Sequence, residues 1–231
     1  MIQISNLIKK YGETVVFSNL NYTFENTCIY GLVGRNGAGK TTLLNILSNY
    51  DKNYTGVISI DRKKMNKVDY LDMPVAYAMD QPSFFNELTI YENLFLIASS
   101  RKIKKQEAFD KIERILDGLG LKKYENYSPL ELSKGTMQRL NNACAMIQEE
   151  KITIFDEPFS GLDPVQMKLL ENVIVEFHKK EKGIYIISSH DIECLQNVCD
   201  KCLLLHNGQI REINMEEVDR EEIAKILSEG E

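Results

Sequence analysis

Four short apolar runs constrain the fold of this chain more than any other feature of its sequence. They are continuously apolar, without the alternation expected of a strand that has one face in water. Such runs are typical of parallel strands that are covered on both faces. The runs comprise residues 27–33, 152–155, 184–188 and 202–205.

Helical periodicity separates these runs. One apolar stripe extends from Val165 to Phe177, after Asp163 and Pro164, which are typical of a helix N-terminus. A second stripe covers residues 108–119 and ends at a glycine. Strands that alternate with helices predict an α/β fold with a mainly parallel sheet.

The remaining segments predict two further parts. Alternating segments at residues 2–8, 14–17, 20–24 and 56–60 predict a small antiparallel sheet, and Tyr11-Gly12-Glu13 predicts a turn within it. Residues 82–130 lack a convincing strand and predict a helical lobe, and Asn207-Gly208 predicts a tight hairpin.

We therefore expect a single domain with an internal division. In this division, residues 1–80 and 151–213 form the core with its β subdomain. Residues 82–150 form the helical lobe and the helix that follows it, and residues 214–231 form a short tail. The acidic segment 216–231 is expected to be a solvated helix.

Composition and charge exclude some classes of function. The net charge of −6 argues against a nucleic-acid-binding role, which normally needs a clustered basic face. No apolar run approaches the roughly 18–20 residues of a membrane-spanning helix. The first ten residues lack the apolar core of a secretory signal. We expect a cytoplasmic chain that reaches a membrane only through a partner.

The five cysteines are an odd number, which does not indicate a disulfide framework in a cytosolic chain. Cys194, Cys199 and Cys202 have a C-x4-C-x2-C spacing that also occurs in some iron–sulfur proteins. They fall on a short predicted helix and on the apolar strand after it. We therefore favour small core residues over a cluster.

Residues 34–41, GRNGAGKT, fit the phosphate-binding pattern G-x-x-x-x-G-K-[ST] between an apolar run and a helical run. Glycines let backbone N–H groups converge on phosphate oxygens, and the following helix adds the positive end of its dipole. Lys40 would contact the β- and γ-phosphates, and Thr41 would be a Mg²⁺ ligand. We expect this segment to bind a nucleoside triphosphate. Its candidate binding residues are Gly34, Arg35, Asn36, Gly37, Ala38, Gly39, Lys40, Thr41 and Thr42.

Two carboxylates, Asp156 and Glu157, follow the second apolar run directly. Ligands of α/β sheets bind outside the carboxyl ends of the strands, so both acids should emerge near the phosphate-binding loop. Asp156 suits a Mg²⁺ contact, direct or through water. Glu157 is placed to act as a general base that activates the attacking water.

Residues 132–139, LSKGTMQR, resemble the signature LSGGQ-x-QR of the ATP-binding cassette family. Other family positions follow in the expected order. Tyr11 matches the adenine-stacking aromatic, Gln81 the Q-loop glutamine, SGLD at 160–163 the D-loop, and His190 the switch histidine. The resemblance extends over residues 2–210. Tyr11 could also be a packed aromatic and His190 a helix cap, but their positions favour the functional interpretation.

The resemblance implies that two cassettes face each other with ATP between them. Ser133 and the Gly135 backbone would contact the γ-phosphate held by the opposite chain, and Asp163 would link the two active sites. His190 would contact the γ-phosphate, and Gln81 would sense Mg²⁺ and the attacking water. ATP would close the dimer, and hydrolysis would reopen it.

Two residues depart from the signature. Lys134 replaces a glycine and Thr136 replaces the glutamine, whereas Ser133 and Gly135 are retained. We expect activity, with an added positive charge beside the nucleotide.

The resemblance thus implies the ATP-hydrolysing subunit of a transporter. This subunit would form a homodimer, or a heterodimer with another cassette, on a separate integral membrane permease at the inner face of the membrane. The compact form is most similar to exporters. The alternatives are a soluble ATPase of iron–sulfur cluster assembly and a nucleotide sensor that does not hydrolyse. The presence of both Glu157 and His190 argues against the sensor.

Overall fold

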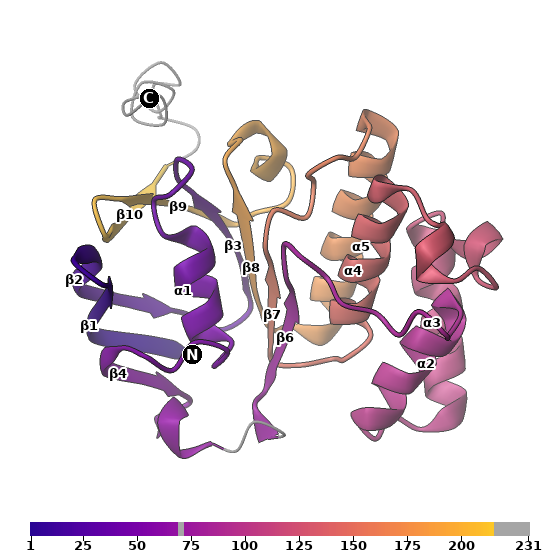
Figure 1. Ribbon diagram of the computed structural model, residues 1–231, viewed down its shortest axis with the longest axis horizontal. Helices are drawn as coiled ribbons and strands as arrows, with labels where there is room; N and C mark the ends of the chain where they lie inside the picture. The colour runs from indigo at the N-terminus through magenta and orange to yellow at the C-terminus, as the bar shows by residue number, and fades with distance from the viewer. Residues whose placement is uncertain (69–71, 215–231) are drawn as a thin grey trace.

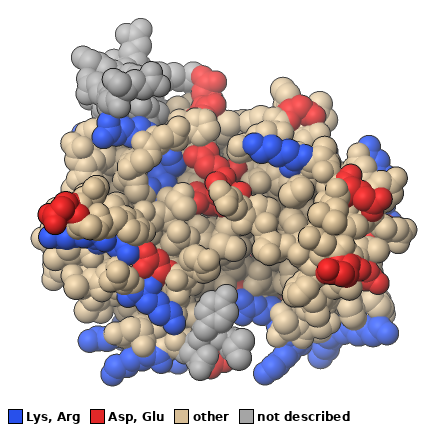
Figure 2. All heavy atoms as spheres, in the orientation of Figure 1, with Lys and Arg blue, Asp and Glu red and all other residues tan. Residues whose placement is uncertain are grey.

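The computed structural model describes residues 1–68 and 72–214 of the chain. Within these residues, two sheets and a set of helices pack side by side (Figure 1). Basic and acidic side chains are interspersed over the face shown in Figure 2. The acidic helix expected at residues 216–231 lies outside the described residues. None of the helices in the described part of the chain is both long and apolar enough to cross a membrane.

The larger sheet has six strands in the order β10-β9-β3-β8-β7-β6. All neighbouring pairs are parallel except β9 and β10, which are antiparallel. Each of the four apolar runs matches one strand of this sheet to within one residue at either end, which confirms the predicted α/β fold with a mainly parallel sheet. The strands are β3 (Cys28–Val33), β6 (Val75–Ala78), β7 (Ile152–Phe155), β8 (Ile184–Ser189), β9 (Lys201–His206) and β10 (Gln209–Ile213).

Both faces of this sheet are buried, which explains the continuous apolar runs. In β8, Ile184 and Ile186 join one hydrophobic cluster, whereas Tyr185 and Ile187 join a second cluster on the other face. The helices that pack around the sheet are α1 (Lys40–Leu47), α2 (Ile90–Ser100), α3 (Lys105–Gly118), α4 (Lys134–Met146) and α5 (Pro164–Glu181).

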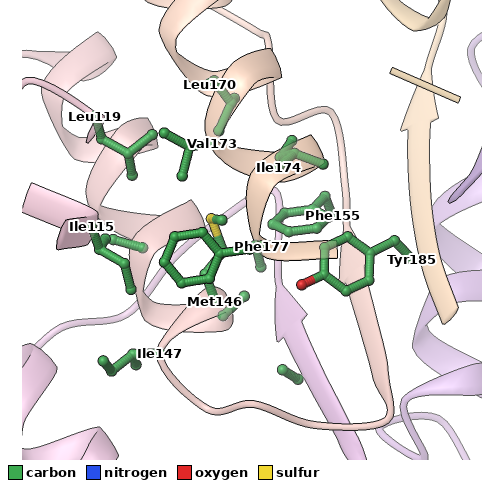
Figure 3. Close-up of a cluster of buried hydrophobic side chains, with 14 of the residues drawn as sticks. Ile115, Leu119, Met146, Ile147, Phe155, Leu170, Val173, Ile174, Phe177 and Tyr185 are labelled. Atoms are coloured by element: carbon green, nitrogen blue, oxygen red, sulfur yellow. The ribbon is translucent and has the colours of Figure 1, made fainter. Parts of the chain in front are cut away.

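The first cluster contains α1 and the smaller sheet, and the second contains α2 to α5. Figure 3 shows the second cluster, in which Phe155 and Tyr185 of the sheet face α4 and α5. In Figure 1, α2 and α3 lie outside α4 and α5. The core therefore fixes the sheet from both sides.

The smaller sheet has the order β2-β1-β4-β5 and is antiparallel, as predicted. The segments expected at 14–17 and 20–24 are one strand, because a positive φ at Asn19 bends the chain without ending its pairing. Its strands are β1 (Ile2–Tyr11), β2 (Thr14–Phe24), β4 (Thr55–Ile60) and β5 (Lys63–Lys64).

Residues 82–130 are all described and contain no strand. Thr89 caps α2 with a reciprocal bond to Glu92, an arrangement that satisfies two backbone N–H groups at the helix end. Short 3₁₀ turns connect α3 to α4 at η3 (Lys122–Tyr124) and η4 (Pro129–Glu131). The division into core, lobe and tail remains a prediction.

Asn207 and Gly208 both have positive φ and join β9 to β10, which confirms the hairpin. The prediction of a short helix before β9 is wrong, because the chain forms only a 3₁₀ turn there, η5 (Glu193–Leu195). There the Asp191 carboxylate accepts a hydrogen bond from the Glu193 N–H, which favours a turn over a helix.

The cysteines near this turn pack as core side chains. Cys202 is buried in β9, and burial raises the pKa of its thiol to about 12. The Cys199 sulfur packs against Gly31 of β3, because a Cβ added at Gly31 would lie only 3.0 Å from it. These thiols stay protonated and apolar in character.

Candidate nucleotide site

Three neighbouring strands end together at one edge of the larger sheet. In the parallel register, Val33 pairs with Ser189, and Phe155 pairs with Ile187. The loops that follow β3, β7 and β8 therefore start side by side. These loops carry the phosphate-binding segment, the acidic pair and His190.

The phosphate-binding segment turns tightly from β3 into α1. The Ala38 N–H donates to the Arg35 carbonyl at 3.1 Å, and Gly37 and Gly39 have φ of 80° and 100°. At Gly39 a Cβ would lie 2.7 Å from Val16, so a larger residue has no room there. The turn therefore needs glycine for both conformation and space.

Lys40, the first residue of α1, is buried across the mouth of this turn. Its ammonium donates to the Gly34 carbonyl at 2.6 Å and lies 3.5 Å from the Glu157 carboxylate. A buried cation at a helix N-terminus creates a strongly positive site for anions.

Asp156 lies beneath the turn and is almost fully buried. The Ser188 hydroxyl donates to its carboxylate at 2.6 Å, and Thr41 forms a second hydrogen bond with it. Burial raises the pKa of this carboxyl, and the neighbouring Glu157 charge adds to the rise. The paired hydroxyl and carboxylate oxygens of Thr41 and Asp156 are the hard ligands that Mg²⁺ prefers, so this pair fits a magnesium ion.

Glu157 projects from the end of β7 between two nitrogen-bearing side chains. Its carboxylate lies 2.9 Å from the His190 Nδ1 and 3.5 Å from the Lys40 ammonium. Its backbone has a positive φ of 48°, and its N–H donates to the Ser188 hydroxyl at 2.9 Å. Ser188 thus holds both acidic residues in place.

A cleft of ≈ 550 Å³ opens above these groups. Glu157 and His190 line it with Tyr11, whereas Gly34, Ala38 and Asp156 are not among its described lining residues. Gln81 is exposed and is not among the described residues that line the cleft, although its neighbour Asp80 is. The lining residues are Tyr11, Thr14, Val16, Arg35, Asn36, Gly37, Gly39, Lys40, Thr41, Thr42, Asp80, Glu157, Ser160 and His190.

Sequence reasoning missed Thr14, Val16 and Asp80 as lining residues. Thr14 and Val16 belong to β2, and no motif marks them. The contact of Val16 with the Gly39 turn arises only when the two sheets pack together. Asp80 follows the short edge strand β6, which the sequence did not reveal.

Ser133 and Asp163 line a second, separate hollow of ≈ 750 Å³. Ser133 caps α4 by accepting a hydrogen bond from the Thr136 N–H, and Asp163 caps α5 by accepting one from the Gln166 N–H. Gly135 packs against Gly161, where an added Cβ would lie 3.0 Å from the carbonyl oxygen. The second hollow shares no described lining residue with the first cleft.

Known proteins resemble this chain over most of its length. The family model described as ABC transporter matches residues 17–160, more than half of the chain. The chain belongs to the ABC transporter family. Membership confirms the predicted family, its nucleotide-binding fold and its ATPase activity.

Individual relatives agree with this assignment. The bacitracin transport ATP-binding protein BcrA of Enterococcus faecalis is 30% identical over 95% of this chain and 71% of its own length. The tungstate uptake system ATP-binding protein TupC of Peptoclostridium acidaminophilum is 30% identical over 91% of this chain and 97% of its own. A solved ATP-binding subunit of an ABC transporter has a TM-score of 0.85 at 26% identity, covering 98% of this chain and 94% of that one.

The two unusual signature residues of this ABC cassette have different surroundings. Thr136 is buried, and its hydroxyl lies 2.9 Å from the Ser133 hydroxyl and 3.3 Å from the Arg139 guanidinium. Lys134 is exposed, and its alkyl stem lies over Gly161. Thr136 therefore helps to order the signature turn, whereas the ammonium of Lys134 adds charge at the surface.

We predict that Ser188→Ala weakens both the fold and the site of this cassette. Because a buried carboxylate loses a donor, the free energy of unfolding should fall by about 1–3 kcal/mol. Phosphate release from ATP should fall as well, because Asp156 and Glu157 lose their common anchor. Chemical unfolding and a phosphate-release assay measure the two effects. Ser99→Ala, at an exposed serine of α2, is the control; equal behaviour of both variants would contradict the role of Ser188.

Proposed function

We propose that this ATP-binding subunit hydrolyses ATP in the cleft at the strand ends and acts as one of two facing cassettes on a separate membrane permease. The observation that carries the proposal is the convergence of Lys40, Asp156, Glu157 and His190 at one edge of the sheet. The charge of these groups and their positions suit a triphosphate and the water that attacks it.

The phosphate-binding turn and Tyr11 would hold the two ends of ATP. The N–H groups of residues 34–42 surround the phosphates, and Lys40 exchanges its bond to the Gly34 carbonyl for phosphate oxygens. Tyr11 lies on the cleft wall with its ring half exposed, which suits stacking on adenine.

Thr41 and Asp156 would hold Mg²⁺, and the sequence prediction adds Gln81, which is not among the described residues that line the cleft. The bound ion would neutralise phosphate charge as the bond to the γ-phosphate breaks. A cation beside Asp156 favours its charged form and so offsets the pKa rise that burial causes.

Glu157 would accept a proton from the attacking water. Its carboxylate is held by His190 on one side and by Lys40 on the other, so it has a fixed direction toward the cleft. His190, once the γ-phosphate is present, can turn from Glu157 to the phosphate because its side chain is exposed.

The two separate hollows support the pairing of cassettes. Ser133 lines the second hollow, and Gly135 lies beside its lining residue Gln166. Among the described residues this hollow shares no lining residue with the ATP cleft, so each ATP would need the signature of a second chain. The N-terminus of α4 at Ser133 would point its partial positive charge at that phosphate. Asp163, at the same hollow, would link the two sites.

The site accounts for ATP hydrolysis in a transporter of either direction. The relatives include a bacitracin transport protein and a tungstate uptake protein. Export remains the prediction that the sequence resemblance makes.

We predict that Glu157→Gln retains ATP binding and abolishes steady hydrolysis, because glutamine keeps the shape but cannot accept the proton. In the presence of ATP this variant should then form a stable dimer, which size-exclusion chromatography with light scattering detects. Glu87→Gln, at an exposed glutamate, should behave like the unaltered chain. Near-normal phosphate release by Glu157→Gln would refute the general-base role.

A mixing experiment tests the pairing of half-sites. Lys40→Met should disable the cleft, and Ser133→Ala should disable the signature, so each variant alone should be nearly inactive. A mixed dimer has one site with both lesions and one intact site. An equal mixture should therefore release phosphate faster than either variant. Activity that stays at the level of the separate variants would contradict sites shared between chains.

A further inference from the structure

Tyr11 has more partners than a tyrosine on a turn requires. It is the last residue of β1, its side chain is 52% exposed, and it lines the nucleotide cleft. Its hydroxyl donates to the Asp51 carboxylate at 3.2 Å. The ammonium of Lys9 lies 4.4 Å from the centroid of its ring, which is within the range of a cation–π contact.

Lys9 is itself buried, with an exposed fraction of 2%. Its ammonium pairs with the Asp51 carboxylate at 2.6 Å and donates to the Asn53 carbonyl at 2.8 Å. Asp51 also accepts a hydrogen bond from the Asn53 N–H at 2.9 Å. Lys9, Asp51 and Tyr11 thus form one connected group, which we term the ring clamp.

The burial of this charge is unusual for a purely structural contact. Taking an ion pair out of water is costly, and an apolar pair of similar size often stabilises a fold as well or better. The ring clamp instead gives a half-exposed aromatic ring two fixed points. The hydroxyl is held at its tip by Asp51, and one ring face is held by Lys9, so the opposite face remains for a ligand.

A ring that is fixed in advance binds a flat partner more tightly than a mobile ring, because less side-chain entropy is lost on binding. A purine base is flat and stacks on aromatic rings. The contacts of Tyr11 therefore match a role in base binding, while the phosphates are held elsewhere by the turn at residues 34–41.

We propose that Lys9 and Asp51 are positioning residues that orient the ring of Tyr11 for the base of the nucleotide. This inference rests on the proposed function and adds to it two residues outside every sequence motif. Neither residue contacts the nucleotide; both act through Tyr11. The ring clamp sets affinity for the base and leaves the grip on the phosphates unchanged.

The test compares two probes on the full chain by calorimetry in Mg²⁺. The first probe is the β,γ-imido analogue of ATP, which has a base, and the second is tripolyphosphate, which has none. The variant Lys9→Met/Asp51→Asn removes both charges together, so no buried charge is left unpaired. Lys10→Met, at an exposed lysine of the same strand, is the control for a lysine-to-methionine change that leaves the ring clamp intact.

We expect the dissociation constant of the ATP analogue to rise about threefold to tenfold in the double variant. The constant for tripolyphosphate should be unchanged. In a Tyr11→Ala background the double substitution should have no further effect, because its target ring is absent. Tyr11→Phe loses only the hydroxyl bond to Asp51, at an exposed position, and should raise the dissociation constant of the ATP analogue by a smaller factor. If the double variant does not fold, an unchanged constant in Tyr11→Phe would overturn the proposal.

Several outcomes would overturn the ring clamp. These are an unchanged affinity for the ATP analogue, an equal loss for both probes, or the same loss with and without Tyr11. Failure of the unaltered chain to bind either probe would instead contradict the proposed function. The two failures are therefore distinguishable.

Discussion

The site depends on the parallel register of β3, β8 and β7. Since Val33 lies beside Ser189 and Phe155 beside Ile187, the three chains leave the sheet at one edge. Burial of both sheet faces fixes this register, because a shift by one residue would move every side chain to the other hydrophobic cluster. This register alone brings together the phosphate-binding turn, the acidic pair and the histidine.

The charges at this edge compensate one another. Lys40 lies between a loop carbonyl and the Glu157 carboxylate, while Ser188 bonds to both acidic residues. A triphosphate with its metal ion would supply partners for both Lys40 and Asp156. Binding would therefore exchange contacts within the chain for contacts with the ligand.

Much of this could be predicted from the sequence, because local patterns carry it. The apolar runs located β3, β7, β8 and β9, and the glycine-rich turn located the start of α1. Features set by tertiary packing could not be predicted. The edge strand β6 is too short for a periodic signal. Lys9 and Asp51 are far apart in the chain and meet only when β1 packs beside the loop between α1 and β4. Gln81 was predicted in the site from its position, yet the structure places Asp80 on the cleft wall instead.

Titration of the purified chain with ATP in a calorimeter, with Mg²⁺ and with a chelator, tests the central assignment most directly. We expect saturable binding that is tighter in Mg²⁺ and at least about tenfold weaker in Lys40→Met, because a buried charge-assisted contact to phosphate is lost. Absence of binding, or equal binding by the unaltered chain and Lys40→Met, would contradict a triphosphate site at the strand ends.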